Sequence, residues 1–295
     1  MRQNPTGRRP AGRRGFGGIR WWVLLLFAGY AAYYWFSNQT VDPYTGEKVL
    51  IDRNLSAEDE EALGLQAYRE ILAQERPVDP DAQIARQIRS IAARLVDRID
   101  EVEAALAAEQ GLQPQNFAAG FDWDVAVLDS DQVNAFALPG GKMAVYTGLV
   151  PVAQNEDAMA AVMGHEIAHA LQRHGAQRMT EQKLAQIGQM AGAASGMDPQ
   201  QMQMVMAVYG YGRALPYARK HETEADYVGL MLMAAACFDP REAVPLWERM
   251  AQASGGQSQP EFASTHPNPG TRIQNLQSWM PKALEFRQGY CESAG

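Results

Sequence analysis

One five-residue segment constrains this chain more than any other. Residues 165–169 read His-Glu-Ile-Ala-His, which matches the pattern H-E-x-x-H. If the segment is helical, His165 and His169 lie on one face and can bind one metal ion together. Glu166 then lies beside them, where it can accept a proton from a water molecule on the metal. The alternative is a buried helix with incidental histidines, which the apolar residues around the motif also fit.

A metal site at these histidines needs a third ligand, because catalytic zinc usually takes three protein ligands and one water. The richest downstream source is the segment His-Glu-Thr-Glu-Ala-Asp at 221–226. Glu222 and Asp226 fall four residues apart on one face of a predicted helix, so one could bind the metal while the other orients a ligand histidine. Taken alone, this segment fits a solvated, charged helix face better. The candidates for the third ligand are His174, His221, Glu222, Glu224, Asp226 and His266.

Charge is distributed unevenly along the chain. It has 26 basic and 34 acidic residues, and six arginines precede its first acidic residue, Asp42. The part after this basic start is therefore strongly acidic, which argues against nucleic acid as a partner. Residues 1–18 are rich in Gly, Pro and Arg and have little to bury, so we expect a disordered tail.

An uncharged run follows the arginines. Residues 21–36 have aromatic side chains at both ends, as membrane helices do, and neighbouring residues can extend the run to about 20. We expect a transmembrane signal anchor over 19–40, which leaves the basic tail 1–18 in the cytosol. A cleaved signal peptide is one alternative, and either an anchor or a signal peptide would export the rest of the chain. A buried soluble helix is the other alternative, which the six preceding arginines disfavour.

After a polar linker over 41–55, the sequence predicts one α+β domain at 56–290, mainly α-helical with a small β-sheet. Strands are expected at 121–127, where polarity alternates, and at 142–147. The apolar stripe that starts near residue 81 predicts one long helix that stops at Gly111. Further helices are expected at 155–174, 178–194, 200–209, 217–236, 240–253, 271–279 and 281–288.

Four ordered motifs carry a resemblance to a known family. They are His165 to His169 with Gln172-Arg173-His174 after it, the segment 221–226, Asn-Ala-Phe-Ala-Leu-Pro-Gly-Gly at 134–141, and Ser-Thr-His-Pro at 264–267 followed by Arg272 and Ile273. This order resembles the gluzincin metallopeptidases of peptidase family M48, which include HtpX and the CAAX prenyl proteases. The likeness is closest to the single-anchor periplasmic branch of BepA and LoiP, and it extends over residues 55–285.

The resemblance implies a zincin-type metallopeptidase domain with one Zn2+ ion per chain. It places the zinc on His165, His169 and Glu222, the last being the first glutamate of an E-x-x-A-D motif, and has Asp226 support the site from outside the ligand set. It also implies peptide hydrolysis by a zinc-activated water, with Glu166 as the general base.

Two further residues are expected to act in catalysis. His266 and Arg272 are candidates for stabilising the oxyanion. His266 could also fill the fourth zinc position and hold the enzyme latent until a client displaces it. An ordinary loop histidine is the alternative for His266.

Residues 134–147 predict a surface that binds substrate. The turn Pro139-Gly140-Gly141 leads into a strand, and a strand at the edge of the sheet can pair with an extended peptide. An interior strand that follows a tight turn is the alternative. The expected substrate contacts are Asn134, Ala135, Phe136, Gly140, Gly141 and Met143.

The motifs together predict a membrane-anchored zinc endopeptidase that degrades misfolded or misassembled envelope proteins. Its partners are then unfolded or misassembled protein substrates, and the membrane through the anchor. We expect a single-pass protein of a bacterial inner membrane, with its N-terminus in the cytosol and its catalytic domain in the periplasm. The first alternative is a chaperone or assembly factor that keeps the fold and binds clients while the zinc is closed off, and the second is a structural domain without metal.

The chain has two cysteines, Cys237 and Cys291, without the C-x-x-C spacing of a metal site. In an oxidising compartment two such cysteines often form a disulfide. A buried Cys237 and a free Cys291 are the alternative, and the sequence does not decide between the two.

Overall fold

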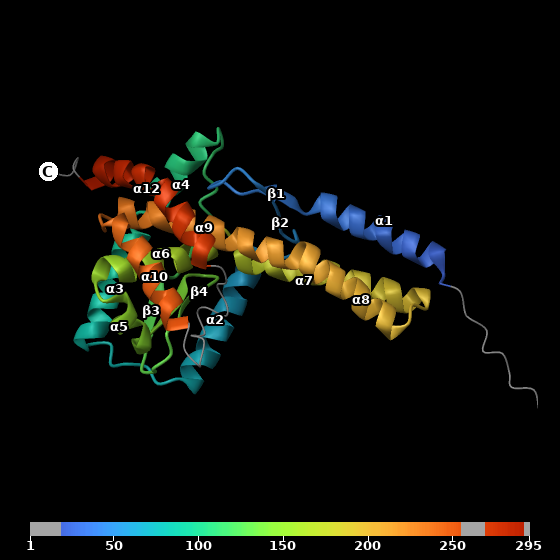
Figure 1. Ribbon diagram of the computed structural model, residues 1–295, viewed down its shortest axis with the longest axis horizontal. Coiled ribbons are helices and arrows are strands. Elements are labelled where there is room, and N and C mark those ends of the chain that lie inside the picture. Colours follow the sequence, from blue (N-terminus) through green and yellow to red (C-terminus); the bar gives the residue numbers. More distant parts are fainter. Residues whose placement is uncertain (1–18, 255–268, 292–295) are drawn as a thin grey trace, which may run out of the picture.

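The structure is a computed structural model that describes residues 19–254 and 269–291. It has a rounded body and a long helical arm that projects from one side (Figure 1). The body combines a helical core with a small sheet. The predicted class, α+β and mainly α-helical, is confirmed.

Two helices form the centre of the body. α6 (Glu156–Leu171) carries the H-E-x-x-H motif and buries every residue after its first two. It packs along α9 (Leu215–Ala235), whose C-terminal half is equally enclosed. α3 (Gln83–Val96), α10 (Ala243–Ser254) and α12 (Pro269–Cys291) surround this pair. The motif therefore lies on the most buried helix of the body.

A three-stranded sheet lies beside these helices. Its strands are β3 (Asp124–Leu128), β4 (Ala135–Leu138) and β5 (Lys142–Tyr146), in the order β3-β5-β4. β5 is the interior strand, parallel to β3 and antiparallel to β4. The strand after the glycine turn is therefore not the edge of the sheet, as the tight-turn alternative supposed, and β4 takes the edge position instead.

Both faces of the sheet are covered. On one face Ala126, Leu128, Ala144 and Tyr146 pack against α2 (Ala57–Gln74), and on the other Val125, Val127, Met143 and Val145 join the main core. The edge strand β4 runs beside α6. The β4 edge of the sheet thus lies next to the helix that carries the motif.

The long helix predicted from residue 81 to Gly111 is two helices. α3 ends at Val96, and α4 (Ile99–Glu109) begins after a two-residue break. Ile88 and Ile91 of α3 and Val102 of α4 are buried in the same core. The break interrupts the helix but not the apolar stripe, which is why the periodicity alone predicted one element.

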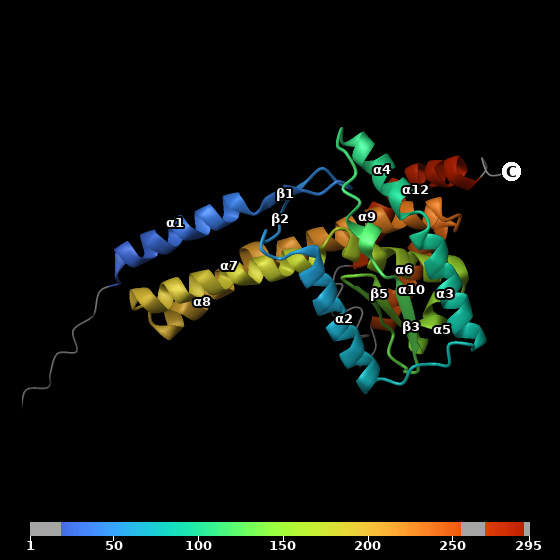
Figure 2. The ribbon, with the colours of Figure 1, turned by 180° about the vertical axis from the view of Figure 1, so that it is seen from behind.

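The arm is a helical hairpin with a third helix alongside (Figures 1 and 2). α7 (His174–Ser195) runs outward, and α8 (Pro199–Tyr209) leads back through a π-helical segment, Gly210–Ala214, into α9. α1 (Trp21–Ser37) packs along α7. The returning helix of the arm is thus continuous with α9, the helix that supplies residues 221–226.

The segment predicted as a polar linker fastens α1 to the hairpin. It contains most of a small antiparallel pair, β1 (Gln39–Val41) and β2 (Lys48–Leu50). The Tyr34 hydroxyl of α1 donates a hydrogen bond of 2.8 Å to the Asp52 carboxylate, with which Lys183 of α7 also pairs. The linker is therefore an ordered part of the arm's base.

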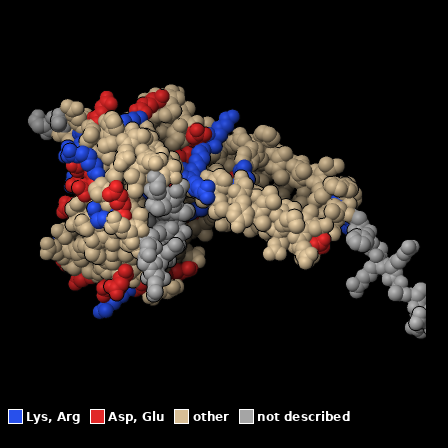
Figure 3. Space-filling model, viewed as in Figure 1, with Lys and Arg blue, Asp and Glu red and all other residues tan. Residues whose placement is uncertain are grey.

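No helix among residues 19–254 and 269–291 is both long and apolar enough to cross a membrane. The transmembrane anchor expected over 19–40 is thus not found, because its residues form α1, a 17-residue helix packed on α7, followed by β1. The arm carries few charges (Figure 3), and its exposed apolar side chains include Trp21, Trp22, Leu25, Leu26, Tyr33, Phe36, Met204, Val208 and Tyr211. The tail over 1–18, expected to be disordered, lies outside the described residues.

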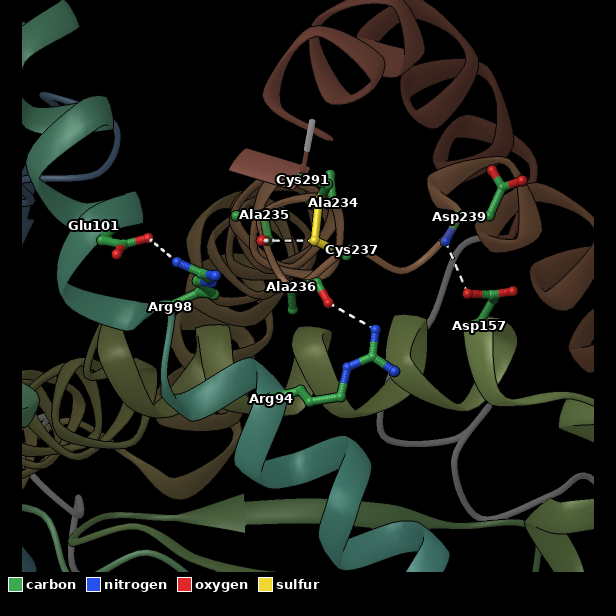
Figure 4. The surroundings of a disulfide bond; sticks show 10 residues. All are labelled: Arg94, Arg98, Glu101, Asp157, Ala234, Ala235, Ala236, Cys237, Asp239 and Cys291. Atoms are coloured by element: carbon green, nitrogen blue, oxygen red, sulfur yellow. Dashed lines mark hydrogen bonds and ion pairs between the residues drawn. A yellow bond between two sulfur atoms is a disulfide. The ribbon is translucent and has the colours of Figure 1, made fainter. Parts of the chain in front are cut away.

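Cys237 and Cys291 are joined by a disulfide bond (Figure 4). Cys237 follows the end of α9, and Cys291 is the last residue of α12, which continues through Pro281 where two helices were expected. Of the two alternatives for the cysteines, pairing is the one that the structure contains. The bond fastens the C-terminal helix to the central one.

Candidate metal centre

The helix that carries the motif has a well-formed start. The Asn155 side chain accepts a hydrogen bond of 2.8 Å from the backbone N–H of Ala158, and acidic residues follow in the first turn. From this fixed start the helix presents His165 and His169, one turn apart, toward α9.

α6 and α9 approach each other closely at two glycines. A Cβ atom on Gly229 would lie 2.7 Å from the backbone nitrogen of His165, and one on Gly164 would lie 2.9 Å from the carbonyl oxygen of Gly229. Side chains do not tolerate such distances, so only glycine fits at this crossing. The close approach brings the first half of α9 within reach of the motif histidines.

His165, His169 and Glu222 direct their ligand atoms toward one another, and we call them the ligand triangle. The two Nε2 atoms are 3.1 Å apart, and Glu222 carboxylate oxygens lie 3.5 Å from Nε2 of His165 and 3.4 Å from Nε2 of His169. Zinc bonds of about 2.0–2.1 Å place the ligands of a tetrahedral site about 3.3 Å apart. All three residues are buried. The donor types and their spacing therefore fit one zinc ion.

Asp226 and Arg272 brace the ligand triangle. Asp226 Oδ1 lies 3.0 Å from Nδ1 of His165, where it can accept the ring proton. Arg272 donates from Nε to Asp226 Oδ2 at 2.5 Å, and from Nη2 to Glu222 at 3.3 Å. Burial alone would raise the pKa of Asp226, but Arg272 and His165 lower it below its usual range, so this carboxyl is ionised.

Trp247 of α10 lies against the ligand triangle, and no sequence pattern pointed to it. Its ring meets that of His165 edge to face, with 5.6 Å between the ring centroids. The Arg272 guanidinium carbon lies 3.6 Å above the centre of the same ring. Trp247 therefore holds Arg272 in place, a role that arises only from the packing of α10 and α12.

A second group of buried polar residues adjoins the ligand triangle. His174, His221 and Glu224 lie together, although each was a candidate for the third ligand. His174 instead approaches the outer nitrogen of His169, with 2.7 Å between the two Nδ1 atoms. Burial and the charge of Arg178 lower the pKa of His174 to about 3, so its ring is neutral.

The predicted substrate contacts are mostly enclosed. The side chain of Met143 is fully buried in the core, and Asn134 and Ala135 are buried as well. Gly140 and Gly141 have φ of 81° and 84° and pack against Glu61 and Trp123, so they serve the turn. Of the six, only Phe136, on the edge strand β4, has a partly exposed side chain.

Of the two residues expected to stabilise the oxyanion, the structure describes only one. His266, also the predicted gate, lies outside the described residues. Arg272 is buried and holds the carboxylates of Asp226 and Glu222. This position suits a residue that braces the ligands.

Known proteins similar to this chain include three proteases. It is 31% identical to the mitochondrial metalloendopeptidase OMA1 of Saccharomyces cerevisiae over 289 residues, which cover 94% of this chain and 79% of the relative. For OMA1 of Schizosaccharomyces pombe the identity is 42% over 168 residues, 56% of this chain and 49% of the relative. The beta-barrel assembly-enhancing protease of Escherichia coli is 28% identical over 206 residues, 67% of this chain and 39% of the relative. The chain thus spans about half the length of the fission-yeast relative.

These relatives correct the expected location. The relatives from yeasts, a plant and human are named as mitochondrial proteases, and none of the described helices could span a membrane. The prediction of a single-pass protein of a bacterial inner membrane, with a periplasmic catalytic domain, is therefore wrong. It rested on an apolar run that packs on α7 as α1.

A family assignment follows from the extent of the match. The sequence model of peptidase family M48 matches residues 93–280, more than half of the chain. This range contains the whole ligand triangle together with Asp226 and Arg272. The resemblance seen in the motifs is thereby confirmed, and the chain belongs to peptidase family M48, a family of metallopeptidases.

Proposed function

We propose that this protein is a zinc-dependent endopeptidase whose substrates are unfolded or misassembled proteins. The observation that carries the proposal is the ligand triangle, because two imidazoles and a carboxylate lie 3.1–3.5 Å apart on two tightly packed helices. Glu166 is buried on the same turn of α6 as His165. These are the groups that metal-assisted peptide hydrolysis needs.

His165, His169 and Glu222 would hold the zinc. When bound there, the ion supplies a Lewis acid that polarises a peptide carbonyl and lowers the pKa of water. Glu166 accepts a proton from the attacking water and returns it to the leaving amine. Asp226 keeps the proton of His165 on Nδ1, so that Nε2 faces the ligand triangle, and Arg272 balances the charge of both carboxylates.

The edge strand β4 supports unfolded chains as the substrate class. Among the described residues, β4 has one neighbour in the sheet, β5, and it runs beside α6. An extended peptide that pairs with such an edge is held through main-chain hydrogen bonds, which depend little on its sequence. The name of the Escherichia coli relative, a beta-barrel assembly-enhancing protease, is consistent with substrates that have failed to assemble.

Removal of the metal tests the proposal. We expect the purified full chain to cleave an unfolded protein such as reduced casein, to lose this activity in a chelator, and to regain it on addition of one equivalent of zinc. Glu222→Gln should lose both zinc and activity, because a neutral amide replaces a charged ligand. Thr223→Ala, the next position on α9, is the matched control and should keep both. Cleavage that persists in the chelated protein would contradict the proposal.

A further inference from the structure

The outer nitrogen of His169 has an unusual partner. Histidines that bind a metal commonly donate their second N–H to a carboxylate, a backbone carbonyl or water. His165 follows this rule through Asp226, at 3.0 Å. His169 does not, because its Nδ1 lies 2.7 Å from Nδ1 of a second imidazole, that of His174.

The position of the proton between these rings follows from the metal. Two nitrogens 2.7 Å apart share one proton, so one Nδ1 donates and the other accepts. If Nε2 of His169 binds zinc, its Nδ1 carries the proton and donates to His174. His174 then accepts at Nδ1 and carries its own proton on Nε2. That Nε2 faces Glu224 Oε2 at 3.6 Å.

We propose that His174 is a positioning residue for zinc: it accepts the Nδ1 proton of His169, and the Glu224 carboxylate opposite its Nε2 favours the required tautomer of His174. This inference rests on the proposed function, in which His169 is a zinc ligand. The resulting chain runs from the metal through His169 and His174 to Glu224, and its members are buried. In the described part of the chain, Nε2 of His174 and Oε2 of Glu224 have no hydrogen-bond partner, and the 3.6 Å between them is slightly longer than a hydrogen bond.

The surrounding structure holds His174 in this position. Arg173 adopts a left-handed conformation with φ of 55°, which turns the chain sharply between α6 and α7 and returns His174 toward His169. An ion pair with Glu60 and stacking over Phe117 at 4.4 Å stabilise that turn. The left-handed conformation is unfavourable for arginine, and these contacts stabilise it at the position where it directs His174 toward His169.

His221 supports His174 from the other side. Their rings stack with 4.2 Å between centroids and 14° between planes. The Gln177 amide nitrogen donates to the carbonyl of Gln172, so its oxygen must accept, at 3.0 Å, from Nε2 of His221 and, at 2.8 Å, from the Tyr217 hydroxyl. His221 therefore has a fixed tautomer of its own, with its Nε2 proton engaged by Gln177.

The same geometry disfavours a second metal ion between His174, His221 and Glu224. An imidazole binds a metal in the plane of its ring, and two parallel stacked rings do not direct their lone pairs at one point. Nε2 of His221 is also engaged by Gln177. The chain from His169 through His174 to Glu224 explains why these polar residues are buried together, without a second metal ion.

Zinc affinity, measured by competition with a chelating dye, tests the proposal. His174→Phe keeps a ring stacked on His221 but leaves the His169 N–H without its acceptor, and we expect affinity to fall by about 10- to 100-fold. His174→Asn places an oxygen near the Nδ1 position and should restore affinity to within about threefold of wild type. Tyr217→Phe removes a neighbouring, part-buried hydrogen bond to Gln177 and should leave affinity unchanged. Equal losses in His174→Phe and His174→Asn, or no loss in either, would overturn the proposal.

A second measurement needs no variant. In 15N-labelled, zinc-loaded wild type, the imidazole nitrogen signals should show His174 protonated at Nε2 and His169 at Nδ1. Protonation of His174 at Nδ1 overturns the proposal, as does a second zinc equivalent that is lost in Glu224→Gln. A wild type that binds no zinc refutes the proposed function itself, whereas normal zinc affinity in a folded His174→Phe refutes only the role of His174.

Discussion

Arg272 connects the ligand triangle to the C-terminal helix at the scale of single residues. It pairs with Asp226 and Glu222, and Trp247 covers its guanidinium group. Without a cation here, two buried carboxylates would face each other next to His165. Arg272 therefore matters to stability in the absence of metal as well as to the geometry of the ligands.

Arg272→Gln should lower the free energy of unfolding by about 3–5 kcal/mol in the metal-free protein, because it leaves buried carboxylates without their cation. Zinc brings a new positive charge to Glu222, so the deficit should shrink in the zinc-loaded protein. Denaturant unfolding with and without zinc measures both values. Arg98→Gln breaks the exposed pair with Glu101, drawn in Figure 4, and should cost less than about 1 kcal/mol in either form. Equal destabilisation by Arg272→Gln in both forms would contradict this account.

The sequence predicted the members of the ligand triangle better than the residues around it. H-E-x-x-H places two side chains on one helix face by periodicity alone, whereas Glu222 was one of six candidates and was singled out only by the family resemblance. The contact between His169 and His174 depends on a left-handed turn at Arg173, a residue type that does not predict such a turn. Contacts of that kind can be identified only in the fold.

At the scale of secondary structure, the crossing of α6 and α9 sets the distance across the metal site. Gly164 and Gly229 allow backbone contact there. Gly229→Ala should force the helices apart, destabilise the protein by about 1–3 kcal/mol and weaken zinc binding. Gly188→Ala, on an exposed part of α7 with no atom within 4 Å of the added Cβ, should instead stabilise it by up to about 1 kcal/mol. Thermal unfolding and zinc titration of both variants measure this. If Gly229→Ala binds zinc as wild type does, the crossing does not set the site.

Helix periodicity was a reliable guide to which residues are helical but not to where each helix begins and ends. The helices of the arm and of residues 155–171 were predicted from apolar spacing and from breakers such as Gly196 and Pro199. The end of α6 at Leu171, three residues before the predicted stop, follows from the turn at Arg173. No Gly or Pro marks the break between α3 and α4, and the apolar residues on both sides of it pack into the same core. The sequence pattern therefore continues through the break.

At the scale of the whole molecule, the apolar residues 21–36 show the limit of hydropathy. An uncharged helix with aromatic ends fits a lipid bilayer and the side of another helix equally well, and sequence alone does not distinguish them. In the structure this helix packs on α7, and its other face leaves Trp21, Trp22 and Phe36 exposed.

The disulfide should contribute to the stability of the whole body. Cys237 and Cys291 are 54 positions apart in the sequence, and closing a loop of that length lowers the entropy of the unfolded chain, which raises the free energy of unfolding by about 4 kcal/mol at 25 °C. We expect a clear fall in the melting temperature under reducing conditions. The double variant Cys237→Ser/Cys291→Ser should have the melting temperature of the reduced wild type, and the reductant should not change it. A wild type with the same melting temperature in both conditions would show that the bond adds no stability.

The role of Glu166 tests the central claim most directly. Zinc content and cleavage of an unfolded protein are to be measured on the same preparations of wild type, Glu166→Gln and Glu156→Gln, the last altering an exposed glutamate in the first turn of α6. If Glu166 transfers the proton, we expect one zinc per chain in all three proteins. The cleavage rate should equal that of wild type in Glu156→Gln and fall at least about 100-fold in Glu166→Gln. Cleavage by zinc-loaded Glu166→Gln at the wild-type rate, or a zinc-loaded wild type that binds unfolded protein without cutting it, would contradict that claim.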